Sequence, residues 1–186
     1  MSEPEKKSGS CLWTLVKLTL LLILVIVVAA LAVGFLVLDG KYDLSREITI
    51  KASPQDVHKQ VGDLREWPNW LPFTKQDPSI KTTIETPTGV DASQHWTGKS
   101  GNGELKFTAS DEETGIKFEM VFDEKYKSKG AITYARSGDE THVTWHMNGQ
   151  NDDFTGKWFA AAMPYMVGPM FEEGLADLKK NVEKKE

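Results

Sequence analysis

The sequence predicts an α+β fold in which a seven-stranded antiparallel sheet wraps around a long C-terminal helix. Two short helices follow the first strand, and one transmembrane helix precedes the folded part. Three observations in the 186-residue chain predict this order: an uncharged apolar run over residues 18–38, apolar residues at every second position through much of residues 44–147, and apolar residues three or four positions apart after residue 168.

The apolar run predicts a membrane-spanning helix. Its 21 residues form about 30 Å of helix, which matches the hydrocarbon thickness of a bilayer. A core helix would need a polar face, which this run lacks. Ala30-Leu31-Ala32 resembles a signal-peptide cleavage site, but cleavage there would leave residues 33–38 as an exposed apolar tail. An uncleaved anchor is therefore the preferred interpretation.

The charges beside the span predict its orientation. Three lysines precede it, Lys6, Lys7 and Lys17, whereas Lys41 follows it between two aspartates. By the positive-inside rule the N-terminus is cytoplasmic. The predicted division is a cytoplasmic tail (residues 1–17), a transmembrane helix (18–38) and an extracytoplasmic domain (39–186). That domain has no cysteine and no Asn-x-Ser/Thr sequon, which favours a single-pass protein of the bacterial inner membrane with a periplasmic domain.

The domain begins with an alternating strand and two short helices. Ile48 and Ile50 mark inward positions of the strand. Ser53 is a typical N-cap and Pro54 suits the first helical position, so a helix is expected from there to about Gly62. The next ten residues contain two tryptophans and two prolines, which predicts a second short helix that ends early.

Six further strands are predicted because apolar residues alternate again from residue 80. Their inward positions include Ile80 and Ile84, Gln94 and Trp96, Leu105 and Phe107, Ile116 to Phe122, Ile132 and Tyr134, and Val143 to Met147. Hairpin turns are expected where Gly, Asn, Asp and Ser gather, at residues 101–103, 111–115, 127–130 and 137–139. Links this short join antiparallel neighbours.

The C-terminal segment is predicted to form the helix that the sheet surrounds. Apolar residues such as Leu178 and Val182 recur at helical spacing, with charged residues on the other side. A straight helix is expected over about residues 168–184, with a bent entry because Pro164 and Pro169 interrupt it. One helix cannot cover seven curved strands completely, so a pocket between helix and sheet is expected.

The composition of the domain points to a ligand in that pocket. After residue 38 there are 16 aromatic residues and 5 methionines but only 19 Ile, Leu and Val. Rings and thioethers suit surfaces that bind varied apolar shapes, although a packed core can have the same composition. The predicted ligand-binding side chains lie at inward strand positions, on the short helices and on the inner side of the C-terminal helix: Trp67, Trp70, Trp96, Phe118, Met120, Trp145, Met147, Phe159, Met163, Met166 and Met170.

Four segments together resemble one protein family. They are residues 52–57 (ASPQDV), 63–70 (DLREWPNW), 141–145 (THVTW) and 166–169 (MVGP) leading into 171–175 (FEEGL). Their order, over about Tyr42 to Lys184, is similar to that of bacterial polyketide cyclase/dehydrase-type proteins of the START and birch-pollen-allergen-like (SRPBCC) superfamily. The resemblance implies a helix-grip fold around a hydrophobic cavity, with ligands such as lipids, sterols and polyketides. Because the fold serves carriers, cyclases and partner-binding modules, it does not imply one activity.

The residue inventory excludes several kinds of site. Cys11 is the only cysteine, which excludes disulfides, cysteine-bound metals and a cysteine nucleophile in the domain. His142 and His146 are expected to point outward about 13 Å apart, too far to share a metal. No metal and no cofactor is therefore predicted. A net charge of −5 without a basic stripe argues against a nucleic-acid partner.

The sequence is therefore interpreted as a membrane-anchored protein that binds a hydrophobic small molecule or lipid between sheet and helix. One alternative is a polyketide cyclase or dehydratase, which needs an acid or base in the pocket. Tyr134 and Arg46 are its candidate catalytic residues, placed to orient or polarise a carbonyl. The other alternative is a ligand-free partner-binding module of the cell envelope, with a filled core and an exposed apolar patch on its rim.

Overall fold

The computed structural model describes residues 9–184, and the chain forms two compact units, Met1–Asp39 and Gly40–Glu186. The first unit contains the helix α1 (Gly9–Leu36), in which the stretch Leu12–Leu36 is long and apolar enough to cross a membrane. The predicted span overlaps this helix but continues two residues past its end. Lys6 and Lys7, on which the predicted orientation partly depends, lie outside the described residues.

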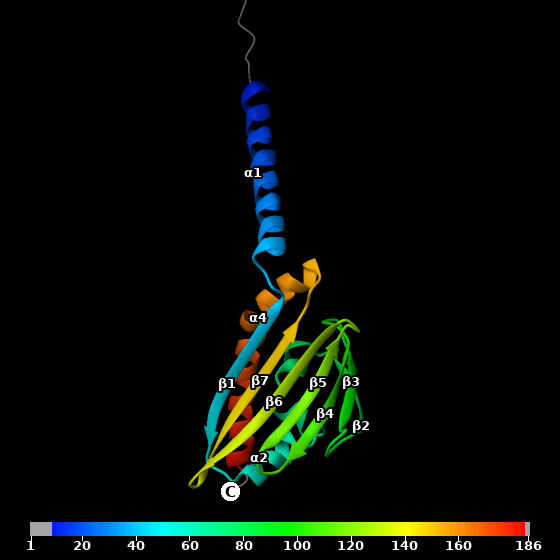
Figure 1. Cartoon of the computed structure of the whole chain (residues 1–186), viewed down its shortest axis with the longest axis vertical. Coiled ribbons are helices and arrows are strands. Elements are labelled where there is room, and N and C mark those ends of the chain that lie inside the picture. Colours follow the sequence, from blue (N-terminus) through cyan, green and yellow to red (C-terminus); the bar gives the residue numbers. More distant parts are fainter. Residues whose placement is uncertain (1–8, 185–186) are drawn as a thin grey trace, which may run out of the picture. The chain divides into compact units, whose positions relative to one another are not determined.

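The second unit is a sheet with helices against one face (Figure 1). Within the described residues its seven strands are β1 (Lys41–Ile50), β2 (Lys81–Thr86), β3 (Ser93–Thr97), β4 (Gly103–Asp111), β5 (Gly115–Phe122), β6 (Tyr126–Ser137) and β7 (Glu140–Gln150). All neighbours are antiparallel, in the order β1-β7-β6-β5-β4-β3-β2. The first strand thus pairs with the last, and the predicted sheet is confirmed.

The helices of this unit are α2 (Pro54–Val61), the 3-10 helix η1 (Trp67–Asn69), α3 (Phe73–Gln76) and the long α4 (Phe154–Glu183). Figure 1 shows α4 lying along one face of the sheet, which confirms the helix-grip arrangement. α2 begins as predicted, because the Ser53 hydroxyl accepts a hydrogen bond from the Asp56 N–H. The second short helix predicted within residues 63–72 is the 3-10 helix η1, and α3 follows it as a further short helix. Pro72 separates them, because proline has no N–H to continue the first.

α4 begins earlier than the sequence pattern predicts. Its first residue is Phe154, and the Asp153 carboxylate caps it by accepting the Gly156 N–H at 3.1 Å. Pro164 and Pro169 lie inside the helix and do not end it. Each proline removes one backbone hydrogen bond, and Figure 1 shows that α4 bends along its length. The predicted bent entry is therefore the first half of one continuous helix.

The turn between β5 and β6 also differs from the prediction. Residues 127–130, expected to form a turn, lie inside β6. The chain reverses instead at Asp123 and Glu124, whose φ angles are +48° and +56°. Aspartate adopts this left-handed conformation more readily than most residues, and the Asp123 carboxylate also accepts the Asn102 N–H at 2.8 Å. This earlier turn places Gly130 in the middle of the sheet.

Gly130 lies where an aromatic ring covers the sheet backbone. A Cβ atom at this position would lie 2.2 Å from Cζ of Phe118 on the neighbouring strand. That ring is itself held in the core, because it packs edge-on against Trp67 with 6.2 Å between ring centroids. Glycine therefore allows the Phe118 ring to lie against β6.

We expect Gly130→Ala to lower the free energy of unfolding by about 1–3 kcal/mol, because the added methyl group displaces a ring that is packed on its other side. Chemical denaturation followed by tryptophan fluorescence measures the change. Thr133→Ala, at an exposed position of the same strand, is the matched control and should change stability by less than about 0.5 kcal/mol. Equal effects of the two substitutions would contradict this account of Gly130.

Candidate ligand site

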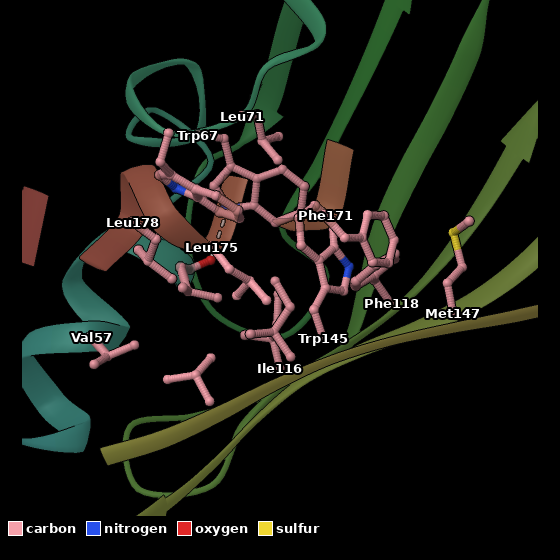
Figure 2. Close-up of a cluster of buried hydrophobic side chains, with 14 of the residues drawn as sticks. Val57, Trp67, Leu71, Ile116, Phe118, Trp145, Met147, Phe171, Leu175 and Leu178 are labelled. Carbon is pink, nitrogen blue, oxygen red and sulfur yellow. Dashed lines mark hydrogen bonds between the residues drawn. The ribbon is translucent and has the colours of Figure 1, made fainter. Parts of the chain in front are cut away.

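The candidate site is the space between the inner face of the sheet and α4, and aromatic rings fill its centre. Trp145 of β7 stacks on Phe171 of α4 with 3.7 Å between centroids and an interplanar angle of 8°. Trp70 packs edge-on against Trp145 at 5.6 Å and against Trp67 at the same distance. Figure 2 shows Trp67, Trp145 and Phe171 gathered in this cluster. The centre of the grip is thus a packed core.

The predicted ligand-binding residues divide by burial into three groups. The buried ones are Trp67, Trp70, Phe118, Trp145, Met147 and Met163, and the half-buried ones are Trp96, Met120, Phe159 and Met170. Met166 is 56% exposed, so its predicted inner position is wrong. It lies on the exposed side of α4, because the helix directs Met163 and Phe171 toward the sheet instead.

The half-buried side chains gather where the sheet meets the first half of α4. Trp96, Gly103, Phe122 and Tyr126 occupy matching positions on β3, β4, β5 and β6 and so form one row across the sheet. Phe159 of α4 stacks on this row, with its ring centroid 6.4 Å from that of Phe122 and 5.0 Å from that of Tyr126. This end of the interior is partly open, unlike the packed centre.

One polar group in the packed centre is unsatisfied. Trp145 Nε1 is buried and has no hydrogen-bond partner among the described residues 9–184. The neighbouring indoles differ, because Trp67 donates to the Val61 carbonyl at 2.8 Å and Trp70 donates to the Gln60 carbonyl at 3.2 Å. Figure 2 shows the Trp145 nitrogen on the side of the ring that faces Phe118 and Met147. The packed centre therefore offers one unused hydrogen-bond donor, and the other such buried donor within the described residues, Nδ2 of Asn151, lies just before α4.

A pair of buried hydroxyl groups near the half-buried end was not anticipated from the sequence. Tyr42 Oη and Ser128 Oγ lie 2.5 Å apart, and both residues are buried. Burial raises the pKa of the Tyr42 phenol, and the Ser128 hydrogen bond partly opposes this. Alternation from Leu44 back to Tyr42 could have predicted the inward tyrosine. Ser128 could not be found this way, because its segment had the composition of a turn.

The two candidate catalytic residues do not share a site. Tyr134 is buried, and its hydroxyl lies 3.4 Å from Nδ1 of His58 on α2. Burial raises the pKa of this phenol well above its usual range, so it stays protonated. Arg46 instead donates from Nε to the Glu172 carboxylate at 2.6 Å, at the edge where β1 meets α4. Their predicted catalytic roles stay predictions.

His58 links α2 to the sheet. Besides its contact with Tyr134, its Nε2 lies 3.3 Å from the Ser110 hydroxyl on β4. Desolvation lowers the pKa of the His58 imidazole, and the charges of Glu112 and Asp111 partly oppose this. His58 is therefore a half-buried packing residue.

Two hollows in the described part of the domain lie outside the interface between sheet and α4. The larger, of about 700 Å³, is lined mostly by outward side chains of β1, β5, β6 and β7, such as Glu119, Lys127 and Lys129. The smaller, of about 510 Å³, lies beside His58 and Ser110. Neither is lined by a residue of α4, so neither is the predicted pocket.

His142 and His146 lie on the outer face of the sheet, as predicted. Nε2 of His142 lies 3.1 Å from the Glu47 carboxylate, and Nε2 of His146 lies 3.0 Å from the Asp43 carboxylate, both on β1. Within residues 9–184 no group of three or more His, Cys, Asp or Glu side chains is placed to hold a metal ion.

Comparison with known protein families shows which family this chain belongs to. Residues 41–183 match the sequence model of the family described as polyketide cyclase / dehydrase and lipid transport. The chain belongs to this polyketide cyclase / dehydrase and lipid transport family. The match covers the whole sheet and all of α4. Among curated proteins, no sequence matches significantly.

Solved structures share the fold of this polyketide cyclase / dehydrase and lipid transport domain at low identity. Norcoclaurine synthase from Thalictrum flavum, in complex with dopamine and hydroxybenzaldehyde, has a TM-score of 0.59 and 15% identity, covering 81% of this chain and 93% of its own. A protein from Chromobacterium violaceum has a TM-score of 0.58 and 15% identity, with coverages of 76% and 98%. A protein from Rhodobacter sphaeroides has a TM-score of 0.59 and 13% identity, with coverages of 78% and 94%. These likenesses establish the fold alone.

We expect His58→Gln to flatten the pH dependence of stability between about pH 7 and pH 5. Because burial holds the folded-state pKa of His58 below its ordinary 6.5, the unfolded chain binds a proton first as the pH falls. The histidine therefore destabilises the fold progressively below about pH 6.5, whereas glutamine does not titrate. Urea denaturation at several pH values measures the slope. An unchanged slope in the variant would contradict this role.

Proposed function

We propose that this protein is a membrane-anchored carrier of a hydrophobic small molecule or lipid that bears a hydrogen-bond acceptor. The observation that carries the proposal is the buried, unpartnered N–H of Trp145 between the sheet and α4. A buried donor without a partner costs about 1–3 kcal/mol, which an acceptor oxygen on a bound molecule would recover. The description of its family as including lipid transport supports the same class of ligand.

Methionine side chains provide the means for a ligand to enter the packed interior. Met120 and Met170 are half-buried, and Met147 and Met163 are buried deeper along the same space. Methionine is unbranched and changes rotamer at little cost, so it can move aside for apolar groups of varied shape. We infer that the ligand enters beside Phe159, where the interior is partly open, and displaces thioethers on its way to Trp145.

The helix α1 is the proposed anchor. Most of its large apolar side chains from Leu12 to Leu36 are exposed, as expected for a helix surrounded by lipid. Under the positive-inside rule the N-terminus is cytoplasmic and the domain lies outside the inner membrane. A tethered carrier would exchange an apolar ligand directly with that bilayer.

The anchor is tested on the full-length chain expressed in a bacterium. We expect it to remain in membranes washed with alkaline carbonate, at the mass of the uncleaved sequence. A shorter product in the soluble fraction would show cleavage near Ala30-Leu31-Ala32 and would contradict the anchor.

The orientation is tested separately. A cysteine introduced at Asp139 in the Cys11→Ser background should react with a membrane-impermeant reagent from outside the inner membrane.

The ligand site is tested by comparing Trp145→Phe with Trp67→Phe. Replacing Trp145 removes a donor that has no protein partner, so occupancy by copurified lipid should fall by up to about tenfold. Replacing Trp67 leaves the Val61 carbonyl unpaired but removes no unused donor, so this variant should lose more stability, by about 1 kcal/mol, and a smaller share of its ligand than Trp145→Phe. Native mass spectrometry measures occupancy, and denaturant unfolding measures stability. Equal ligand occupancy in both variants would contradict a hydrogen bond between Trp145 and the ligand.

A second candidate is a ligand-free module that binds a protein partner. The filled centre of the grip and the exposed Trp158 and Tyr165 on α4 favour it, because such a module needs no cavity and presents an apolar patch. Gentle isolation followed by native mass spectrometry separates the two candidates. A carrier should copurify with a bound small molecule and melt at a higher temperature with members of a lipid panel. A consistently empty protein, unaffected by the panel, would overturn the carrier proposal.

A further inference from the structure

The outward face of the first half of α4 is apolar. Trp158, Tyr165 and Met166 are 40%, 84% and 56% exposed, and Ala161 and Pro169 beside them are also exposed. Lys157 is the only charged residue between positions 154 and 171. Large apolar side chains gathered on one exposed face mark an interaction surface.

The same helix has an ordinary water-exposed face in its second half. Glu172, Glu173 and Lys180 are exposed there. Lys75 of α3 lies 3.8 Å from the Glu173 carboxylate and 2.6 Å from that of Asp177. The outward face therefore changes from apolar to charged within one turn, after Pro169. A boundary of this kind is expected where a helix passes from an apolar surrounding into water.

The apolar half of α4 lies at the point where the chain enters the domain. Gly40, the first residue of the domain, accepts the Asn151 N–H at 2.9 Å, just before α4 begins. A Cβ atom on Gly40 would lie 3.2 Å from Cγ of Lys157 in the first turn of α4. Only residues 37–40 separate this contact from the end of α1, and they can span at most about 14 Å.

We propose that the face of α4 formed by Trp158, Ala161, Tyr165, Met166 and Pro169 lies in the interfacial layer of the bilayer that holds α1. The inference rests on the proposed anchor, because that anchor keeps this face within reach of the membrane at all times. Tryptophan and tyrosine favour the interface, where the ring contacts acyl chains and the polar atom contacts water. This face carries almost no charge, so its contact with the bilayer would depend on apolar and interfacial contacts and would not need acidic lipid headgroups.

Docking of this face would also serve ligand transfer. Phe159 is on the inner side of the same turns of α4 and stacks on Phe122 and Tyr126 at the partly open end of the interior. With Trp158 and Tyr165 in the interface, that end would lie beside the lipid surface. A hydrophobic ligand could then pass between bilayer and grip with little exposure to water.

The test uses the full-length chain in liposomes of phosphatidylcholine alone. Cys11→Ser removes the natural cysteine, and a spin label is then placed at Tyr165→Cys, Asp139→Cys or Val25→Cys in turn. Collision with oxygen, which concentrates in the bilayer, is compared with collision with a water-soluble nickel chelate. We expect the oxygen-to-nickel ratio at position 165 to be severalfold above that at position 139, in the exposed β6–β7 turn, and below that at position 25 in α1. Adding Trp158→Ser and Met166→Ser, both at exposed positions, should lower the ratio at position 165 toward the aqueous value.

The outcomes separate this inference from the proposed anchor. A label at position 25 in the hydrocarbon with a label at position 165 as aqueous as that at 139 would overturn the docking and leave the anchor standing. An aqueous label at position 25 would overturn both. A label at position 165 shielded from both reagents would show that protein covers this face, either a second copy or another partner, and would equally overturn the docking.

Discussion

The stacking of Phe171 on Trp145 holds α4 against the sheet, and the remaining interior contacts of the domain are arranged around it. The two rings are nearly parallel at 3.7 Å between centroids. A small residue on the next turn makes this possible, because a Cβ on Gly174 would lie 3.2 Å from Cζ3 of Trp145. Leu175 and Leu178 then continue the contact as fully buried side chains. One helix can therefore hold a broad sheet only where its inner face is this closely packed.

The consequence is a helix with two unlike halves. From Phe171 onward α4 is buried on the inside and charged on the outside, which is the pattern of a helix on the surface of a stable core. Before Phe171 it is only partly buried on the inside, around Phe159, and apolar on the outside. The first half lies where the chain enters the domain, and both proposals concern this half. Both proposals give the apolar side chains of this half a contact other than water: a bound ligand on the inner side and the bilayer on the outer side.

Much of the fold could be predicted because its signals are local. Alternation assigned the inward face of β7 correctly from Val143, Trp145 and Met147, and the Ser53-Pro54 pair predicted the start of α2. The predictions failed where local chemistry was ambiguous. The Gly130 segment has the composition of a turn, yet glycine is there because Phe118 needs the space. Met166 has the spacing of an inner residue but is exposed, since the position of the helix axis over the sheet depends on contacts far away in the sequence.

The sequence by itself determined the apolar helix, the antiparallel strands, the inward face of most strands and the family resemblance, because each depends on residue types at fixed short spacings. Only the tertiary structure decided that β1 pairs with β7, that the rings fill the centre of the grip, that the N–H of Trp145 alone among the three clustered indoles has no partner within residues 9–184, and that Trp158 and Tyr165 face outward. These features depend on contacts between residues far apart in the sequence, and a pattern read along the chain contains no information about which distant residues meet.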